Sequence, residues 1–135
     1  MENSTVQEIA PDITLRWLHN KQIALFTIRT VDRTSWEAWQ KTMMDLKGNW
    51  PLDRPFLTIQ DNAFDKVAST PSVREYALQV GRFRPEVAQF SAVILPKNFV
   101  AQFVDLSVRN NHDPNVSVRV FFTIADGLTW LESKL

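Results

Sequence analysis

The sequence predicts a single α/β domain: a five-stranded, mostly parallel sheet with four helices in the order ββαβαβαβα. Short apolar segments typical of strands alternate with amphipathic segments of helical period along most of the chain. Helices of about 10–14 residues between strands imply crossover connections, which join parallel strands and are right-handed. The length of 135 residues suits one domain, and a 44% hydrophobic content is typical of a globular chain.

The N-terminal part predicts a tail followed by a strand pair. We expect residues 1–12 to form a flexible tail, with the option of a short edge strand, and residues 13–135 to form the domain. Apolar and polar residues alternate over Ile13–Trp17, which is strand periodicity, and the nearly continuous apolar run Ile23–Ile28 indicates a buried strand. The polar residues 19–22 between them are typical of a turn.

The segment 34–46 predicts the first helix. Thr34 and Glu37 have the spacing of a capping box, and Trp36, Trp39 and Met43 recur at helical intervals. The remaining elements follow from the same patterns: strands at Phe56–Asp61, Phe90–Leu95 and Val116–Phe122, and helices at Thr70–Phe83, Asn98–Val108 and Thr123–Leu135. In the last helix, Thr123 lies three residues before Asp126 and is predicted as the cap.

Composition excludes several classes of function. Fifteen basic and fifteen acidic residues give zero formal net charge, so no long-range field attracts nucleic acid or an anionic membrane. Without cysteine there is no disulfide, thiolate nucleophile or zinc–thiolate site. No apolar run reaches the roughly 18 residues of a membrane span, and the polar start MENSTVQEIAPD lacks the pattern of a signal peptide. We therefore expect a cytoplasmic protein.

Three segments resemble the STAS/SpoIIAA-like domain superfamily. They are the strand PFLTIQD, the hydroxyl-rich helix start that follows it, and the closing stretch VRVFFTIADGLTWLESKL. The resemblance covers roughly Ile13 to Leu135, judged by pattern and element order. It implies a noncatalytic regulatory module that binds a partner protein, in some members under control of Ser or Thr phosphorylation at the start of the second helix. Asp61 matches the acid at the strand end by position, whereas the family's Asp-Ser-Ser-Gly motif does not occur here.

The candidate binding site is the loop and helix start after the strand 56–61. Its residues are Asp61, Asp65, Ser69, Thr70, Ser72, Val73 and Arg74. Two interpretations stay open. The hydroxyl of Thr70 caps the helix, with Pro71 at the first helical position, or the free amides of Ser72 and Val73 hold an anion with help from Arg74.

Other residues give weaker signals for chemistry. Asp61 and Asp65 could form a carboxylate pair, but loop acids more often form turns, and we expect no catalytic residue. His19 and His112 lie in separate turns and make a poor metal set. The three glycines are scattered, and no phosphate-binding fingerprint is present, so we expect no cofactor.

Trp36, Trp39 and Trp50 are candidate pocket aromatics, since five tryptophans is a high count for this length. Trp36 and Trp39 also fit core packing, and Trp50, in the loop GNWPLDRP, reads as a lid over the core or an exposed contact.

Together these observations predict a noncatalytic regulatory or protein-interaction module of unknown partner that also self-associates through exposed apolar helix faces or an edge strand. The alternative is a small apolar-ligand or lipid-binding protein whose pocket lies between the sheet and the Trp36/Trp39 helix. An enzyme of unknown type is the third hypothesis; it requires ionisable groups that converge in one cleft.

Overall fold

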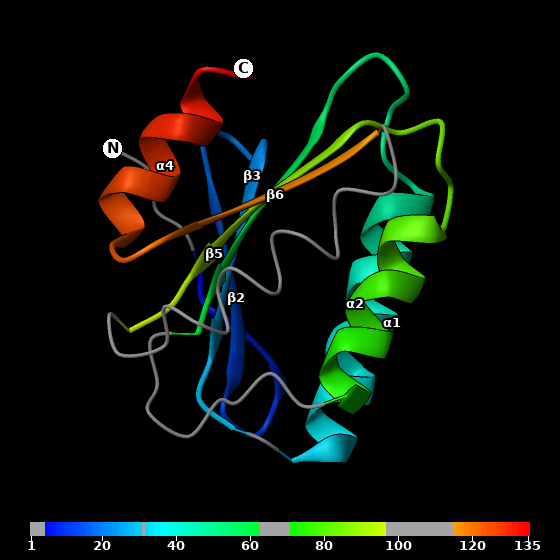
Figure 1. The fold of residues 1–135 in the computed structure, drawn as a ribbon, viewed down its shortest axis with the longest axis vertical. Coiled ribbons are helices and arrows are strands. Elements are labelled where there is room, and N and C mark those ends of the chain that lie inside the picture. The colour runs from blue at the N-terminus through cyan, green and yellow to red at the C-terminus, as the bar shows by residue number, and fades with distance from the viewer. Residues whose placement is uncertain (1–4, 31, 63–70, 97–114) are drawn as a thin grey trace.

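The computed structural model describes residues 5–30, 32–62, 71–96 and 115–135. Those ranges hold six strands and three helices in a single α/β unit (Figure 1). The strands are β1 (Gln7–Ala10), β2 (Ile13–Leu18), β3 (Ile23–Ile28), β4 (Phe56–Asp61), β5 (Gln89–Ile94) and β6 (Val116–Phe121). The helices are α1 (Arg33–Gly48), α2 (Pro71–Arg82) and α4 (Ile124–Glu132).

The predicted α/β class is confirmed, but the count of five strands is wrong. Residues Gln7–Ala10, inside the segment expected as a tail, form β1 and pair antiparallel with β2, so the option of a short edge strand is the one realised. The sheet therefore has a strand more than predicted. The helix expected at Asn98–Val108 lies outside the described residues.

The strands lie in the sheet in the order of the chain, β1 to β6. β1, β2 and β3 form an antiparallel meander, and β3, β4, β5 and β6 are parallel. The β2–β3 turn falls at the predicted polar break, where His19, Asn20 and Lys21 take the left-handed conformation with φ of 54°, 54° and 65°. Such angles are uncommon for residues other than glycine, and they let a four-residue turn close the hairpin.

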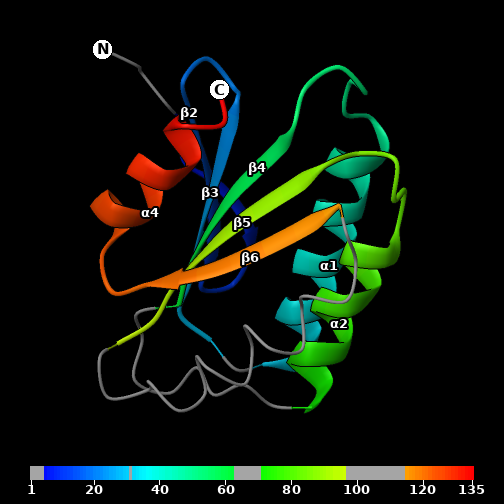
Figure 2. The same cartoon turned by 45° about the horizontal axis from the view of Figure 1, so that its top comes forward.

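Helices cover the two faces of the sheet unequally. The crossovers through α1 and α2 advance along the sheet in the same direction, so right-handed connections place both helices on one face. The helix α4 follows β6 and packs on the opposite face (Figures 1 and 2). The result is a three-layer arrangement with a longer helix pair on one side and a nine-residue helix on the other.

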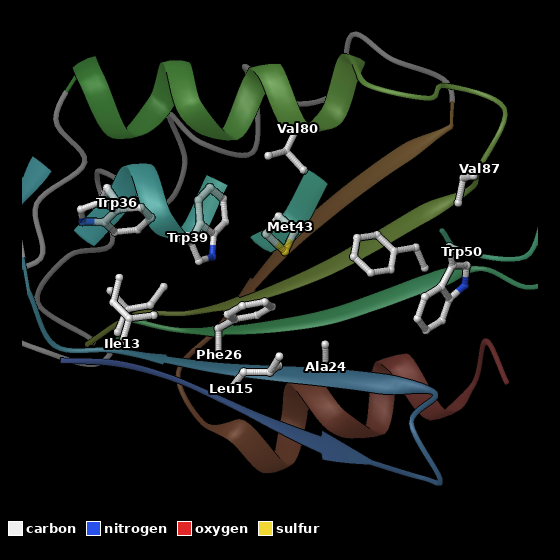
Figure 3. Close-up of a cluster of buried hydrophobic side chains, with 12 residues drawn as sticks. Ile13, Leu15, Ala24, Phe26, Trp36, Trp39, Met43, Trp50, Val80 and Val87 are labelled. Atoms are coloured by element: carbon white, nitrogen blue, oxygen red, sulfur yellow. The ribbon is translucent and has the colours of Figure 1, made fainter. Parts of the chain in front are cut away.

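The face under α1 and α2 holds the larger hydrophobic core (Figure 3). Trp36, Trp39 and Met43 project from α1 toward Ile13 and Phe26 on β2 and β3. The core comprises Ile13, Leu15, Ala24, Phe26, Ile28, Trp36, Trp39, Met43, Trp50, Phe56, Val80 and Val87. Alternate strand residues supply it because successive side chains in a strand point to opposite faces.

The face under α4 is packed at close range through Gly127. A Cβ on Gly127 would lie 3.1 Å from the Cβ of Ala92 and 3.1 Å from the Cδ1 of Ile94. The missing side chain thus lets α4 approach β5 closely, and Leu131 on the same helix is fully buried in this second core.

Side-chain caps define the helix starts, one as predicted and one not. Thr123 caps α4 and accepts a hydrogen bond from the Asp126 amide, which confirms the predicted cap. The predicted Thr34–Glu37 capping box is wrong: Asp32 is the N-cap of α1 and accepts from the Ser35 amide. A carboxylate two residues earlier caps a free amide in the first turn of a helix that begins at Arg33, and it suits the positive end of the helix dipole.

Basic side chains cap the C-termini of α1 and α2 reciprocally. Lys47, in the last turn of α1, is fully buried, and its Nζ donates to the carbonyls of Val80 and Gly81 on α2, at 3.1 and 3.2 Å, and to Gln89 Oε1 at 2.8 Å. Arg84, just after α2, donates from Nη1 to the carbonyls of Lys47, Gly48 and Trp50 at 2.7–2.9 Å. Each helix thus satisfies carbonyls at the end of the other.

The polar contact at Lys47 continues into the sheet. Gln89 Nε2 donates to Ser91 Oγ at 3.1 Å, and Ser91 shares a hydrogen bond of 2.9 Å with Thr58 on β4. All three side chains are buried. Buried polar groups are stable only when paired, so this chain of contacts fixes how α1, β4 and β5 fit together.

Replacing Lys47 with methionine tests the reciprocal cap. K47M keeps most of the volume but leaves two helix carbonyls and Gln89 Oε1 without their buried donor. We expect a loss of about 2 kcal/mol in the free energy of unfolding, measured by urea denaturation. K41M removes a charge from the exposed face of the same helix and should cost little. A K47M protein as stable as K41M would contradict the structural role of the Lys47 ammonium.

A pair of glycine substitutions tests the close approach of α4. G127A places a methyl group against Ala92, a buried residue of a central strand that cannot move aside, and should destabilise by about 1 kcal/mol net. G81A, in the last turn of α2, meets nothing nearer than 3.8 Å and should be neutral or stabilise by up to about 1 kcal/mol through helix propensity. Thermal unfolding of both variants measures the difference, and equal shifts would contradict the proposed packing.

Candidate functional site

The carboxyl ends of the parallel strands form one edge of the sheet. Register places Asp61, Ile94 and Phe121 in one row across β4, β5 and β6. The next row is held in step by hydrogen bonds from the Asn62 amide to the Ile94 carbonyl at 2.9 Å, and from the Leu95 amide to the Phe121 carbonyl at 3.0 Å. The ordered ladder therefore extends one residue beyond the strands, to the residues that open the connections.

An ion pair joins the ends of β3 and β4 at this edge. Arg29 follows β3, and its Nη2 donates to Asp61 Oδ2 at 3.0 Å while Nη1 donates to the Asp61 and Ile28 carbonyls at 3.1 and 3.0 Å. The Asp61 side chain is 6% exposed and that of Arg29 is 38% exposed. A buried carboxylate with such a partner is a fixed structural element as well as part of the edge.

The same edge carries one amide after β4 and two apolar side chains after β6, with β5 between these two strands. The Oδ1 of Asn62 is shielded from solvent and accepts no hydrogen bond from the part of the chain that the structure describes. Phe122 and Ile124, on either side of the Thr123 cap, are 39% and 37% exposed. We call Arg29, Asp61, Asn62, Phe122 and Ile124 the carboxyl-edge surface.

The connections leave this edge toward opposite faces. The chain passes from β4 to α2 on one face, and from β6 to α4 on the other (Figure 2). Ligands of open α/β sheets gather outside the carboxyl ends of the strands, where these connections begin. Asn62 and Phe122 lie at this edge, with β5 between the strands that they follow.

The structure distributes the predicted binding residues unevenly. Asp61 ends β4 as expected, but it is buried and bonded to Arg29. Ser72, Val73 and Arg74 lie in the first turn of α2, which begins at Pro71 as predicted. Asp65, Ser69 and Thr70 lie outside the described residues, so the expected carboxylate pair and the Thr70 cap stay predictions.

The three candidate pocket aromatics are buried in the core. The indole N–H of Trp36 donates to the Thr30 carbonyl at 3.2 Å, and that of Trp39 donates to Gln60 Oε1 at 2.9 Å. Trp50 is also buried, donates to the Pro55 carbonyl at 3.0 Å and stacks on Trp17. Of the two readings of Trp50, a lid over the core is therefore confirmed.

Polar side chains join α1 and α2 along their outer seam. The Tyr76 hydroxyl accepts from Arg33 Nε at 3.3 Å and donates to Glu37 Oε1 at 3.2 Å, and Gln40 donates to Gln79. The contact with Tyr76, followed by the nearby charge of Glu37, raises the pKa of Arg33. Glu37, expected to close a capping box, is instead part of this interhelical network.

Of the two histidines, His19 lies within the described residues and His112 lies outside them. His19, in the β2–β3 turn, contacts Glu132 of α4, with 2.8 Å between Nε2 and Oε2. Among residues 5–30, 32–62, 71–96 and 115–135, no three His, Cys, Asp or Glu side chains gather as metal ligands.

None of the helices in those ranges has the length and hydropathy that crossing a bilayer requires.

Sequence reasoning missed Arg29 and Phe122. Arg29 directly follows a buried strand and Asp61 ends the next one, so the parallel pairing alone brings the two charges to the same edge. Phe122 was included in a strand, and its exposure becomes evident only once the chain is seen to turn at Thr123.

A double-mutant cycle on R29Q and D61N measures the edge ion pair. We expect a coupling of about 1–2 kcal/mol in the free energy of unfolding, because one partner is buried and the other is partly solvated. The same cycle on R33Q and E37Q, an exposed pair four residues apart on α1, should show a coupling within experimental error. Equal couplings in the two cycles would contradict a special role for the Arg29–Asp61 pair.

Searches of known family models, curated proteins and solved structures return no match to this chain.

Proposed function

We propose that this protein is a noncatalytic, STAS-like interaction module that binds a protein partner through the carboxyl-edge surface. The observation that carries the proposal is the composition of that surface. An ion pair and an amide lie at the ends of β3 and β4, and two half-exposed apolar side chains follow β6 at the same edge of the sheet. Mixed surfaces of this kind, with apolar anchors and a polar surround, are typical of protein–protein contacts.

The state of the buried charges supports binding over catalysis. A general acid or base needs a carboxylate that can reach a substrate, and the Asp61 carboxylate is buried against the Arg29 guanidinium. The Lys47 ammonium lies under α2, with three hydrogen bonds to neighbouring oxygens. Both groups contribute to the fold, and neither faces open solvent.

The polar groups of the edge fit a peptide-like partner. The Arg29 guanidinium keeps 38% of its side chain exposed while it holds Asp61, so its outer rim is accessible to a carbonyl or carboxylate. Phe122 and Ile124 would supply the apolar anchors.

The position of Asp61 just before the connection to α2 also supports the carboxyl-edge surface as the binding site. Asp61 starts the connection to α2, the segment to which the STAS/SpoIIAA-like resemblance assigns regulation and partner binding. Phosphorylation of a Ser or Thr near the start of α2 would add negative charge close to Arg29 and the positive end of a helix dipole. A partner that contacts the carboxyl edge would sense that change directly.

Two matched phenylalanine substitutions test the proposal. Phe122 at the carboxyl edge and Phe83 at the opposite edge are 39% and 40% exposed, so F122S and F83S remove equal apolar area from two ends of the sheet. A photo-crosslinking amino acid at position 124 identifies a partner in cells, and calorimetry with the purified partner gives the affinity. We expect F122S to weaken binding about tenfold or more and F83S to leave it within about twofold.

Two results would overturn the proposal. One is an equal loss of affinity in F122S and F83S, which would reflect a general change in stability. The other is crosslinking at position 124 to no protein while a crosslinker at Leu52, exposed at the opposite edge, captures one reproducibly.

A further inference from the structure

Three aromatic rings and two cations form a cluster on the α4 face, away from the carboxyl-edge surface. Trp130 of α4 packs edge-to-face on Phe90 of β5, with ring centroids 6.0 Å apart, and is tilted against Phe121 of β6 at 5.8 Å. Arg119 and Lys134 lie over these rings. We call these five residues the Trp130 cluster.

Both cations of the cluster contact the same indole. The Arg119 Cζ is 5.5 Å and the Lys134 Nζ is 5.8 Å from the centroid of the Trp130 ring. Arg119 also lies over Phe121 at 5.9 Å, and Lys134 over Phe90 at 5.1 Å. Cation–π contacts of this length hold the two side chains against the aromatic surface without using their N–H donors for hydrogen bonds.

Those donors have no acceptor in the described part of the chain. No hydrogen bond or ion pair in residues 5–30, 32–62, 71–96 and 115–135 uses the Arg119 guanidinium or the Lys134 ammonium. Glu132, the nearest acid along α4, is in contact with His19. Arg119 is exposed and Lys134 is half-buried, so N–H donors of both side chains are accessible from solvent.

We propose that the Trp130 cluster is a docking site for a carboxylate-rich segment of a partner protein. Two cations on one aromatic base form a preorganised receptor, because the rings restrict side-chain motion before binding and so lower its entropic cost. A carboxylate takes two parallel hydrogen bonds from a guanidinium and one from an ammonium. In an extended segment, acids two residues apart lie on the same side about 7 Å apart, so one segment can present two carboxylates to this face of the domain.

Charge favours an acidic peptide over nucleic acid as the occupant. Nucleic-acid surfaces neutralise many phosphates and need a broad positive field, whereas this chain has zero net charge and the cluster holds two cations. The site uses different residues from the carboxyl-edge surface, so either proposal can fail without the other.

A titration with short synthetic peptides tests the site. The probe is a peptide that alternates Glu and Ser, and its control alternates Gln and Ser. Nuclear magnetic resonance follows the five indole N–H signals, that of Trp130 being assigned with W130F. We expect the Glu peptide to shift the Trp130 signal and to leave the signals of Trp36 and Trp39, whose indoles are hydrogen-bonded in the other core, unchanged. The Gln peptide should shift none of them.

Matched charge removals provide the second arm of the test. R119Q with K134Q removes both cations of the cluster, and K41Q with R82Q removes two exposed cations from α1 and α2 on the opposite face. We expect the first pair to weaken Glu-peptide binding about tenfold or more and the second to change it less than about threefold. Thermal unfolding checks that both proteins stay folded under the conditions of the titration.

Each other outcome would overturn the proposal. Equal losses in the two double variants would mean that overall charge attracts the peptide. Equal shifts with the Gln peptide would mean that carboxylates are not recognised. Tighter binding of single-stranded oligothymidylate than of the Glu peptide would assign the cluster to nucleic acid instead.

Discussion

The buried ammonium of Lys47 is the contact on which the packing of the larger core depends. It sits where the ends of α1 and α2 meet the start of β5, and it supplies donors to oxygens of two of those elements at once. Arg84, which follows the C-terminus of α2, donates in turn to carbonyls at and just beyond the C-terminus of α1. A cation at a helix C-terminus is favoured by the dipole, and here two parallel helices exchange cations. Neither helix can shift along its axis without breaking both sets of hydrogen bonds.

The hydrogen bonds of Lys47 continue into the core through further buried polar side chains. Gln89, Ser91 and Thr58 link the Lys47 ammonium to the middle of the sheet, and Gln60 receives the Trp39 indole N–H. A purely apolar interface would tolerate small displacements, whereas paired buried polar groups penalise every alternative register. The helix layer and the parallel strands are therefore locked together, and the residues that leave the carboxyl ends, Asn62 and Phe122, project from a rigid base.

Local sequence patterns were enough for the class of fold, but contacts between distant residues were not accessible to them. Alternating apolar residues revealed β2, and Thr123 marked the start of α4, because both signals lie within a few residues. Residues 1–12 were predicted as a tail with the option of a short edge strand, since a strand of four residues, Gln7–Ala10, gives only a weak local pattern. Local patterns gave no signal for Lys47 or Arg29, because their partners lie 33 and 32 residues further along the chain. The candidate site included Asp61, but local patterns could not show that its carboxylate pairs with Arg29 at the end of the neighbouring strand.

The contact between His19 and Glu132 spans 113 residues and connects the β2–β3 turn to the last described helix. During synthesis on the ribosome, the strands that form the α4 face emerge long before α4 does, and α4 is the described helix that covers Ile23, Leu25, Leu57 and Ile59. Until nearly all of the described residues are made, this apolar face of the sheet must therefore be kept from associating with other polypeptides. A cellular chaperone that binds apolar strands would act on the nascent chain before α4 is synthesised.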